Sequence, residues 1–340
     1  MDLQKFIEKN LTKRSALSYI LFPLSLIYGK IQKIRRYYYG KFPALSYESS
    51  KKIISVGNIV SGGSGKTPFV IFLANYLTNK GKKVAISHRG YKGDFEDSVK
   101  IISDKESIYT EASRAGDEAF LIANSLKGIP VVVGKNRKFA VRTLEKRFPD
   151  LDYIILDDSF QHLKVKHNID FILFNETSRL GNGFVLPAGL LREPLSSIKF
   201  ADIIVWNGDN IPDNIKVFQK DMLKAIYKLA GYYDKNEIPI KKIIGDKNIL
   251  VSGIGTPKSF ENLLQKNGVK FFKHFIFADH YEYTQDSLRK IEEFAKANFI
   301  KNILVTEKDW SKIKFIENNL NLVIVKARFE ILDVGVLGKL

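Results

Sequence analysis

The 340-residue sequence contains no cysteine. Disulfide bridges, thiolate metal sites and cysteine nucleophiles are therefore excluded, and this absence suits a reducing compartment. The uncharged stretch near the N-terminus, residues 16–29, is too short to cross a bilayer, because a membrane-spanning helix needs about 20 apolar residues. We also find no internal repeat, low-complexity tract or zinc-ligand spacing. What remains is a chain long enough for one large or two medium globular domains.

Acidic residues are few relative to basic ones, which gives a formal net charge of +17. Residues 1–52 carry eleven Lys or Arg against three Asp or Glu, so much of the excess lies at this end. Such a charge predicts an anionic partner: a lipid surface, a phosphorylated substrate or nucleic acid. No helix-turn-helix pattern or RNA-recognition signature accompanies the charge, so we predict that nucleic acid is not a partner.

A glycine-rich motif stands between an expected strand, residues 53–60, and an expected amphipathic helix. It comprises Gly62, Gly63, Ser64, Gly65, Lys66, Thr67 and Pro68. The motif is a tighter variant of the phosphate-binding loop, because Val60 stands where the strict pattern has its first glycine. In such a loop, backbone N–H groups and the helix N-terminus face phosphate oxygens, Lys66 reaches the β- and γ-phosphates, and Thr67 binds Mg²⁺. The sequence therefore predicts a site for ATP and Mg²⁺.

The N-terminal segment combines apolar, basic and aromatic residues. Pro23 interrupts the uncharged stretch, and Lys33, Arg35, Arg36 and three tyrosines follow it. This composition is typical of an element that lies in the membrane interface. A cleaved signal peptide is disfavoured, because it would carry the phosphate-binding loop away from ATP and no cleavage site follows. A buried core helix remains the alternative.

The rest of the chain alternates apolar strands with helices, which predicts an α/β fold with a mostly parallel sheet. The strands expected after the loop are residues 83–87, 99–102, 130–134, 153–156, 170–174 and 203–206. We predict four parts: a membrane-associated segment (1–40), a P-loop NTPase-like domain (41–215), a lysine-rich linker (216–247) and a smaller α/β domain (248–340).

Polar residues follow several of these strands. Asp157 and Asp158 come directly after the strand 153–156, where a carboxylate pair can hold Mg²⁺ directly or through water. Arg192 lies in a loop rich in glycine and proline, where an arginine can clamp a phosphate bidentately. His280 follows an expected strand of the second domain, and its sequence context alone favours an ordinary structural histidine.

Eight short motifs occur in a fixed order: S-G-G-S-G-K-T-P, S-H-R-G-Y, G-D-E, V-V-V-G-K-N-R, D-D-S-F-Q-H, L-P-A-G-L-L-R-E-P, F-A-D-H and T-E-K-D. Together they resemble the tetraacyldisaccharide 4'-kinase family of the lipid A pathway, over nearly the whole chain. The resemblance implies a two-domain P-loop fold on the cytoplasmic face of the bacterial inner membrane. From the N-terminal segment we expect the association to be peripheral or monotopic, and we expect a monomer. The resemblance also implies transfer of the γ-phosphoryl group of ATP to the 4'-hydroxyl of a tetraacylated glucosamine disaccharide 1-phosphate, giving lipid IVA.

The same resemblance assigns roles to residues in the matched motifs. It implies that Lys66 and the glycine-rich backbone hold the phosphates and that Asp157 and Asp158 bind Mg²⁺ with Gln161 nearby. Asp117 matches the general base, and His280 matches its partner in an Asp-His dyad. Arg137 and Arg192 match arginines that neutralise charge or contact substrate. A base shared between two domains would assemble only when they close over ATP.

Two positions depart from the family pattern. Ser159 stands where glycine is usual, and Ala278 where proline is common. Because serine is less free than glycine at positive φ, we expect Ser159 to alter the turn after the aspartates.

The chief alternative is a membrane-tethered P-loop ATPase switch of the deviant-Walker type. Those proteins carry a signature lysine where this chain has Ser61, which argues against the switch. The candidate base Asp117 also favours a kinase. A basic ATPase that binds nucleic acid would instead be retained by DNA or RNA in a strongly salt-dependent way.

Overall fold

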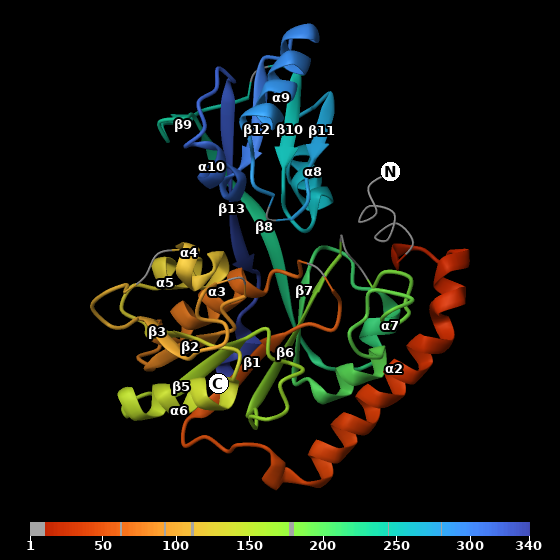
Figure 1. Ribbon diagram of the computed structural model, residues 1–340, viewed down its shortest axis with the longest axis vertical. Coiled ribbons are helices and arrows are strands. Elements are labelled where there is room, and N and C mark those ends of the chain that lie inside the picture. The colour runs from red at the N-terminus through yellow and green to blue at the C-terminus, as the bar shows by residue number, and fades with distance from the viewer. Residues whose placement is uncertain are drawn as a thin grey trace. The chain divides into compact units, whose positions relative to one another are not determined.

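The chain divides into two compact units. The computed structural model describes residues 11–61, 63–91, 93–109, 112–176, 180–243, 245–279 and 281–340. Unit 1 comprises Met1–Ala225 and Ile331–Leu340, and unit 2 comprises Ile226–Glu330 (Figure 1). The chain passes from unit 1 to unit 2 within strand β8 (Asp221–Tyr233) and returns at the end of β13 (Leu322–Ile331).

The stretch predicted to be a linker, residues 216–247, contains strand β8 and the short β9 (Pro239–Ile240). Residues Asp221 to Ala225 of β8 pair in parallel with β7. Leu223 and Ala225 are buried in alternation with the more exposed Met222 and Lys224. The many lysines of the stretch hide this alternation, which is the pattern of a half-buried strand.

Unit 1 is built on a mostly parallel sheet with β1 (Lys52–Gly57) near its centre. The strand order is β8-β7-β6-β1-β5-β2-β4-β3, and only the edge strand β3 pairs antiparallel among these described strands. The other strands of this unit are β2 (Val84–His88), β3 (Lys100–Ser103), β4 (Val131–Val133), β5 (Tyr153–Asp157), β6 (Ile169–Asn175) and β7 (Ile203–Asn207). This arrangement confirms the predicted α/β fold class.

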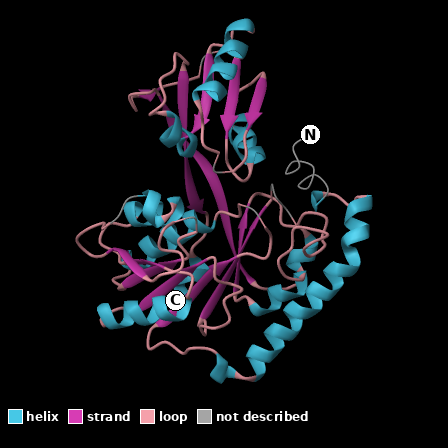
Figure 2. Ribbon diagram, viewed as in Figure 1, coloured by secondary structure: helices cyan, strands magenta, loops and turns pink. Residues whose placement is uncertain are grey.

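Helices cover both faces of this sheet (Figure 2). Ile53 of β1 packs in one cluster with Ala140 and Leu144 of α6 (Arg137–Arg147). On β6, Phe171 pairs with Val56, so its side chain leaves the opposite face from Ile53. There its ring lies 5.2 Å from that of Phe69 in α3. Further described helices of the unit are α3 (Lys66–Asn79), α4 (Ala112–Ala115), α5 (Asp117–Ser125) and α7 (Asp213–Lys216), with short 3-10 turns at Pro43–Leu45, Leu195–Phe200 and Gly335–Lys339.

The central strand is shorter than the sequence predicts. We expected residues 53–60, but β1 ends at Gly57, and Val60 forms only an isolated bridge with Leu191. A Cβ on Gly57 would lie 2.5 Å from the Cβ of Phe160, so only glycine allows the loop after β5 to approach this closely. The ends of β1 and β5 therefore meet tightly, and this contact positions the site.

The N-terminal helix α2 (Ala16–Lys41) buries small and polar residues and exposes large apolar ones, which is the reverse of an ordinary amphipathic helix of a soluble domain. Its buried residues are Ser18, Ser25, Gly29 and Arg36, which recur every seven, four and seven residues. Large apolar side chains are exposed on the opposite face, at Ile20, Leu24, Ile27, Ile31, Ile34 and Tyr38, and we call these six residues the apolar stripe. The alternative of a buried core helix is therefore wrong. No helix within the described residues is long and apolar enough to cross a membrane.

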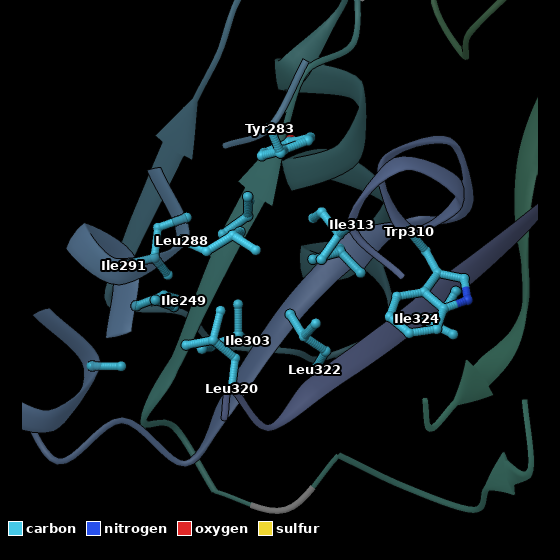
Figure 3. Packing of buried hydrophobic residues seen from close by; sticks show 13 residues of the cluster. Ile249, Tyr283, Leu288, Ile291, Ile303, Trp310, Ile313, Leu320, Leu322 and Ile324 are labelled. Carbon is cyan, nitrogen blue, oxygen red and sulfur yellow. The ribbon is translucent and has the colours of Figure 1, made fainter. Parts of the chain in front are cut away.

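Unit 2 is a smaller α/β unit whose parallel strands follow the order β11-β10-β12-β13. Alternate residues of β10 and β12 point to opposite faces of the sheet and pack into two separate hydrophobic clusters. Ile249 and Ile303 pack with α9 and α10 on one face (Figure 3). Leu250 and Leu304 pack with α8 on the other. The elements are β10 (Asn248–Ser252), α8 (Pro257–Lys266), β11 (Lys273–Ile276), α9 (Gln285–Ala297), β12 (Asn302–Thr306) and α10 (Glu307–Ile313).

Candidate functional site

The glycine-rich loop leads into α3 as the motif predicts. Gly65 is the residue before the helix and has φ 83° and ψ 26°, a left-handed conformation that favours glycine. The side chain of Asn58 donates to the Val60 carbonyl at 2.7 Å and to Ser64 Oγ at 2.9 Å, so it fastens the loop to the end of β1. Pro68 lies in the first helical turn, where its missing N–H is not needed. Gly62 lies outside the described residues.

A short pairing brings Arg192 to this loop. The Ser61 N–H donates to the Leu190 carbonyl at 2.8 Å, and the Arg192 N–H donates to the Ile59 carbonyl at 2.7 Å. From this position Arg192 Nη1 lies 3.2 Å from both carboxylate oxygens of Asp158. Lys66 Nζ lies 3.6 Å from the same carboxylate. The structure therefore brings together three residues that the sequence separates by up to 126 positions.

Asp158 is held in its charged form. Burial by itself would raise its pKa, but the charges of Lys66 and Arg192 outweigh burial and lower the pKa to about 2. Its φ of 49° is unusual for a residue other than glycine, so the backbone of this turn holds a conformation that costs free energy. When a nucleotide and a metal ion bind at this helix N-terminus, Asp158 can exchange Lys66 and Arg192 for the metal ion. The two cations are then available to bind phosphate.

Asp157 has a different environment. Its side chain is buried, and burial raises its pKa. Its Oδ2 lies 3.7 Å from His88 Nε2, whereas its Oδ1 has no hydrogen-bond partner within the described part of the chain. A buried carboxylate oxygen that lacks a partner is costly unless a ligand satisfies it.

The donors at this place fit Mg²⁺. Thr67, Asp157 and Asp158 offer only oxygen atoms, which Mg²⁺ prefers, and the Asp157 oxygen lacks a partner. Nowhere in the described residues could a group of three or more His, Cys, Asp or Glu side chains hold a metal ion. Two carboxylates with a hydroxyl suit Mg²⁺, because in nucleotide enzymes it takes its other ligands from phosphates and water.

Arg137 and Gln161 hold the backbone around the aspartates. Arg137 is buried and donates to the Asp157 carbonyl at 2.5 Å, and its Nη1 lies 3.3 Å from Ser87 Oγ. Burial lowers its pKa to about 10, so it stays charged at neutral pH. Gln161 donates to the Asn58 carbonyl at 2.8 Å. Both residues therefore brace the turn, and Arg137 also adds positive charge to the site.

Asp117 begins α5 and is exposed. The preceding Gly116 has φ 85°, and a Cβ there would lie 2.7 Å from the Tyr91 carbonyl, so glycine is required. The next residue, Glu118, lies 3.5 Å from His88 Nε2, which also faces Asp157. His88 therefore connects the start of α5 to the aspartates. His280, predicted to partner Asp117, lies outside the described residues.

Sequence reasoning expected ligand contacts in the turn that begins at His88 without naming His88 as a site residue, and it missed Glu118 and Asn58. His88 carried a signal, because it is the last residue of a strand whose carboxyl end faces the loop. Nothing in the sequence marks Asn58, whose role depends on the path of the loop.

The expectation that Ser159 alters the turn is wrong. The positive φ belongs to Asp158, and Ser159 does not share it. The Ser159 hydroxyl lies 2.9 Å from the Leu156 carbonyl and 3.0 Å from Ser55 Oγ, so it is fully accommodated. Ser159 itself is therefore accommodated without backbone strain, and the strained residue of the turn is Asp158.

His162 gives the site a measurable pH dependence. Burial and then the charge of Arg137 lower its pKa from 6.5 to about 4. Between these values the unfolded chain binds a proton that the folded chain does not, so this contribution to stability is present above pH 6.5 and is lost as the pH falls. We expect His162→Gln to reduce the loss of unfolding free energy between pH 7 and pH 5 by about 2 kcal/mol. Urea titrations at both pH values measure it, and an unchanged loss would contradict the assignment.

Comparison with known proteins decides the family. The profile of the family described as tetraacyldisaccharide-1-P 4'-kinase, LpxK, matches residues 17–339. The chain belongs to this family. The tetraacyldisaccharide 4'-kinase of Halothermothrix orenii is 34% identical over 338 residues, which cover 90% of this chain and 87% of that protein. That of Actinobacillus pleuropneumoniae serotype 5b is 34% identical over 316 residues, covering 93% and 92%.

A solved structure of the LpxK family supports the fold. The crystal structure of "apo" form LpxK from Aquifex aeolicus in complex with ATP matches with a TM-score of 0.71 and 28% identity, and the match covers 95% of this chain and 98% of that one. The family, the P-loop kinase fold and the class of enzyme predicted from the ordered motifs are thereby confirmed.

Proposed function

We propose that this protein is an ATP-dependent lipid kinase. It transfers the γ-phosphoryl group of ATP to the 4'-hydroxyl of a tetraacylated glucosamine disaccharide 1-phosphate, giving lipid IVA in lipid A biosynthesis. The observation that carries the proposal is the meeting of Lys66, Arg192 and Asp158 at the N-terminus of α3, beside the buried Asp157. Membership of the LpxK family supplies the acceptor.

The residues of this site have two roles in phosphoryl transfer, binding of the phosphates and binding of the metal ion. Such transfer needs alignment and charge stabilisation more than covalent help. Lys66, Arg192 and the N–H groups at the start of α3 hold the β- and γ-phosphates in line. Thr67, Asp157 and Asp158 would hold Mg²⁺, which would supply positive charge beside the phosphate oxygens.

A base is also needed for the acceptor. We propose that Asp117 takes the proton of the sugar hydroxyl as its oxygen bonds to the γ-phosphorus. The bond from the γ-phosphorus to the bridging oxygen breaks, and ADP leaves. We further propose, on the resemblance, that His280 pairs with Asp117.

Product mapping tests the acceptor. The protein is incubated with Mg²⁺, γ-labelled ATP and detergent-dispersed disaccharide 1-phosphate lipid, or with the same lipid lacking the 4'-hydroxyl. We expect a bisphosphorylated lipid from the first acceptor only. Labelled product from the 4'-deoxy lipid, or a label that maps to another position, would contradict the proposed acceptor.

We also propose that the protein works as a monomer on the cytoplasmic face of the inner membrane. The apolar stripe of α2 exposes six large side chains on one face, and basic residues of the same helix flank it. Apolar residues that enter the acyl boundary beside cations that meet anionic headgroups give interfacial binding. A substrate with four acyl chains stays in the bilayer, so the enzyme must come to it.

Charge placed in the apolar stripe should release the protein from membranes. We expect the triple variant Ile20→Asp, Ile27→Asp and Ile31→Asp to bind phosphatidylglycerol–phosphatidylethanolamine vesicles at least a hundredfold more weakly, because a loss of about 1 kcal/mol at each of three partly inserted isoleucines already amounts to that factor. Vesicle co-sedimentation measures it. The matched control makes the same charge change at the exposed residues Val217, Phe299 and Phe315 and should bind normally. Equal binding of both variants would refute the assignment.

A further inference from the structure

Helix α2 carries one charged residue on its buried face, Arg36, with all residues of this helix described. The side chain of Arg36 is 8% exposed, and that of its partner Glu193 is 1% exposed. Arg36 Nε lies 2.5 Å from Glu193 Oε2 and Nη2 lies 3.1 Å from Oε1, so the pair is bidentate. A bidentate guanidinium–carboxylate pair fixes orientation as well as distance.

The guanidinium also holds the segment that follows the aspartates. Arg36 Nη2 donates to the Phe160 carbonyl at 3.0 Å, and the guanidinium carbon lies 4.2 Å from the centre of the Phe160 ring. The neighbouring Arg35 donates to the Gln161 carbonyl at 2.8 Å. Two arginines of α2 therefore bind consecutive residues of the turn that begins with Asp157 and Asp158.

The carboxylate holds the other side of the site. Glu193 follows Arg192 directly, and Arg192 binds Asp158 through its guanidinium and the Ile59 carbonyl through its N–H. One ion pair thus joins the segment that carries Arg192 to the segment that carries Asp158, and it anchors both to α2.

We propose that Arg36 and Glu193 form a positioning pair that sets Arg192 against Asp158 and makes the geometry of the phosphate and metal site depend on how α2 is seated. This inference deepens the proposed function and rests on it for the catalytic readout. A buried ion pair is weak support for stability, because apolar residues of similar size often replace one without loss. Apolar residues cannot replace the planar guanidinium of Arg36, which donates to the Glu193 carboxylate and to the Phe160 carbonyl at the same time.

The test compares a variant with an apolar pair against the wild-type protein. Arg36→Met with Glu193→Met removes both charges, so neither is left buried alone. The first readout needs no lipid: it is the Mg²⁺ concentration that gives half-maximal binding of a fluorescent ATP analogue. The second is kcat for lipid phosphorylation, and thermal unfolding reports the fold. The control is Glu145→Gln, which disturbs a carboxylate bonded to Tyr47 and Ser49 in the same unit.

We expect the double variant to unfold near the wild-type temperature, to need at least fivefold more Mg²⁺ and to show kcat at least tenfold lower, with the KM for the lipid unchanged. Arg36→Lys keeps the charge but not the fork, and should raise the Mg²⁺ requirement at least threefold even if the double variant fails to fold. The control should leave the Mg²⁺ requirement and kcat unchanged. Wild-type Mg²⁺ dependence in either folded variant would overturn the proposal. Failure of the wild-type protein to label lipid would refute the proposed function instead, and the Mg²⁺ comparison would still decide the positioning role.

Discussion

Replacing Lys66 with alanine is expected to lower kcat for phosphoryl transfer about a thousandfold. Its ammonium lies at the start of α3 beside Asp158, where it meets the charge that moves between the β- and γ-phosphates. Removing one preorganised group that stabilises such charge costs about a hundredfold to a thousandfold in kcat, and the site here is mostly shielded from water. Single-turnover kinetics with labelled ATP measure the chemical step directly.

The fold should survive this substitution. Arg192 still neutralises Asp158 when Lys66 is absent, so no carboxylate is left alone. Lys82→Ala, at an exposed lysine just after α3, serves as the matched control and should react at the wild-type rate. A Lys66→Ala protein that retained a third or more of wild-type kcat would show that this lysine does not contact the transferred phosphate.

Loss of Asp117 should lower kcat by a hundredfold to ten-thousandfold, the usual contribution of a general base. The carboxylate begins α5, which the contacts of Glu118 with His88 tie to Asp157. Because Asp117 is proposed to act on the acceptor and not on ATP, Asp117→Asn should leave the affinity for Mg²⁺-ATP within about twofold of wild type. Equilibrium binding and steady-state kinetics together give the separation.

Asp97→Asn is the control for Asp117→Asn. The Asp97 side chain is 90% exposed, and Lys135 Nζ lies 3.7 Å from its Oδ1. It should keep both kcat and nucleotide affinity. If Asp117→Asn also kept its kcat, the base would have to be another group; if it lost nucleotide binding, Asp117 would belong to the ATP site instead.

The strands and the glycine-rich loop could be predicted because the formation of each depends mainly on residues that are neighbours in the sequence. The apolar run that ends at Asp157 and the one that leads into Gly62 can be recognised without information on distant contacts. The strand predicted at residues 153–156 is β5, Tyr153–Asp157, for the same reason. Where lysines mask the alternation, as in β8, the pattern fails and a strand was taken for a linker.

Distant partners could not be predicted in this way. Arg36 and Glu193 are 157 positions apart. The sequence groups Arg36 with the basic residues of the membrane segment, whereas the structure buries it against Glu193, to which the sequence assigns no role. Arg192 reaches Asp158 only because residues 59–61 pair with residues 190–192. The polar face of α2 is the exception, since Ser18, Ser25, Gly29 and Arg36 recur at helical spacing and could have been read as its buried side.

Transfer of the γ-phosphoryl group to a lipid is the step that distinguishes a lipid kinase from an ATPase. Under single-turnover conditions with the lipid acceptor in excess, the moles of labelled lipid are compared with the moles of ADP formed. We expect one labelled lipid for each ADP and almost no free phosphate. ADP matched by free phosphate, with no labelled lipid, would contradict the kinase and favour an ATPase switch.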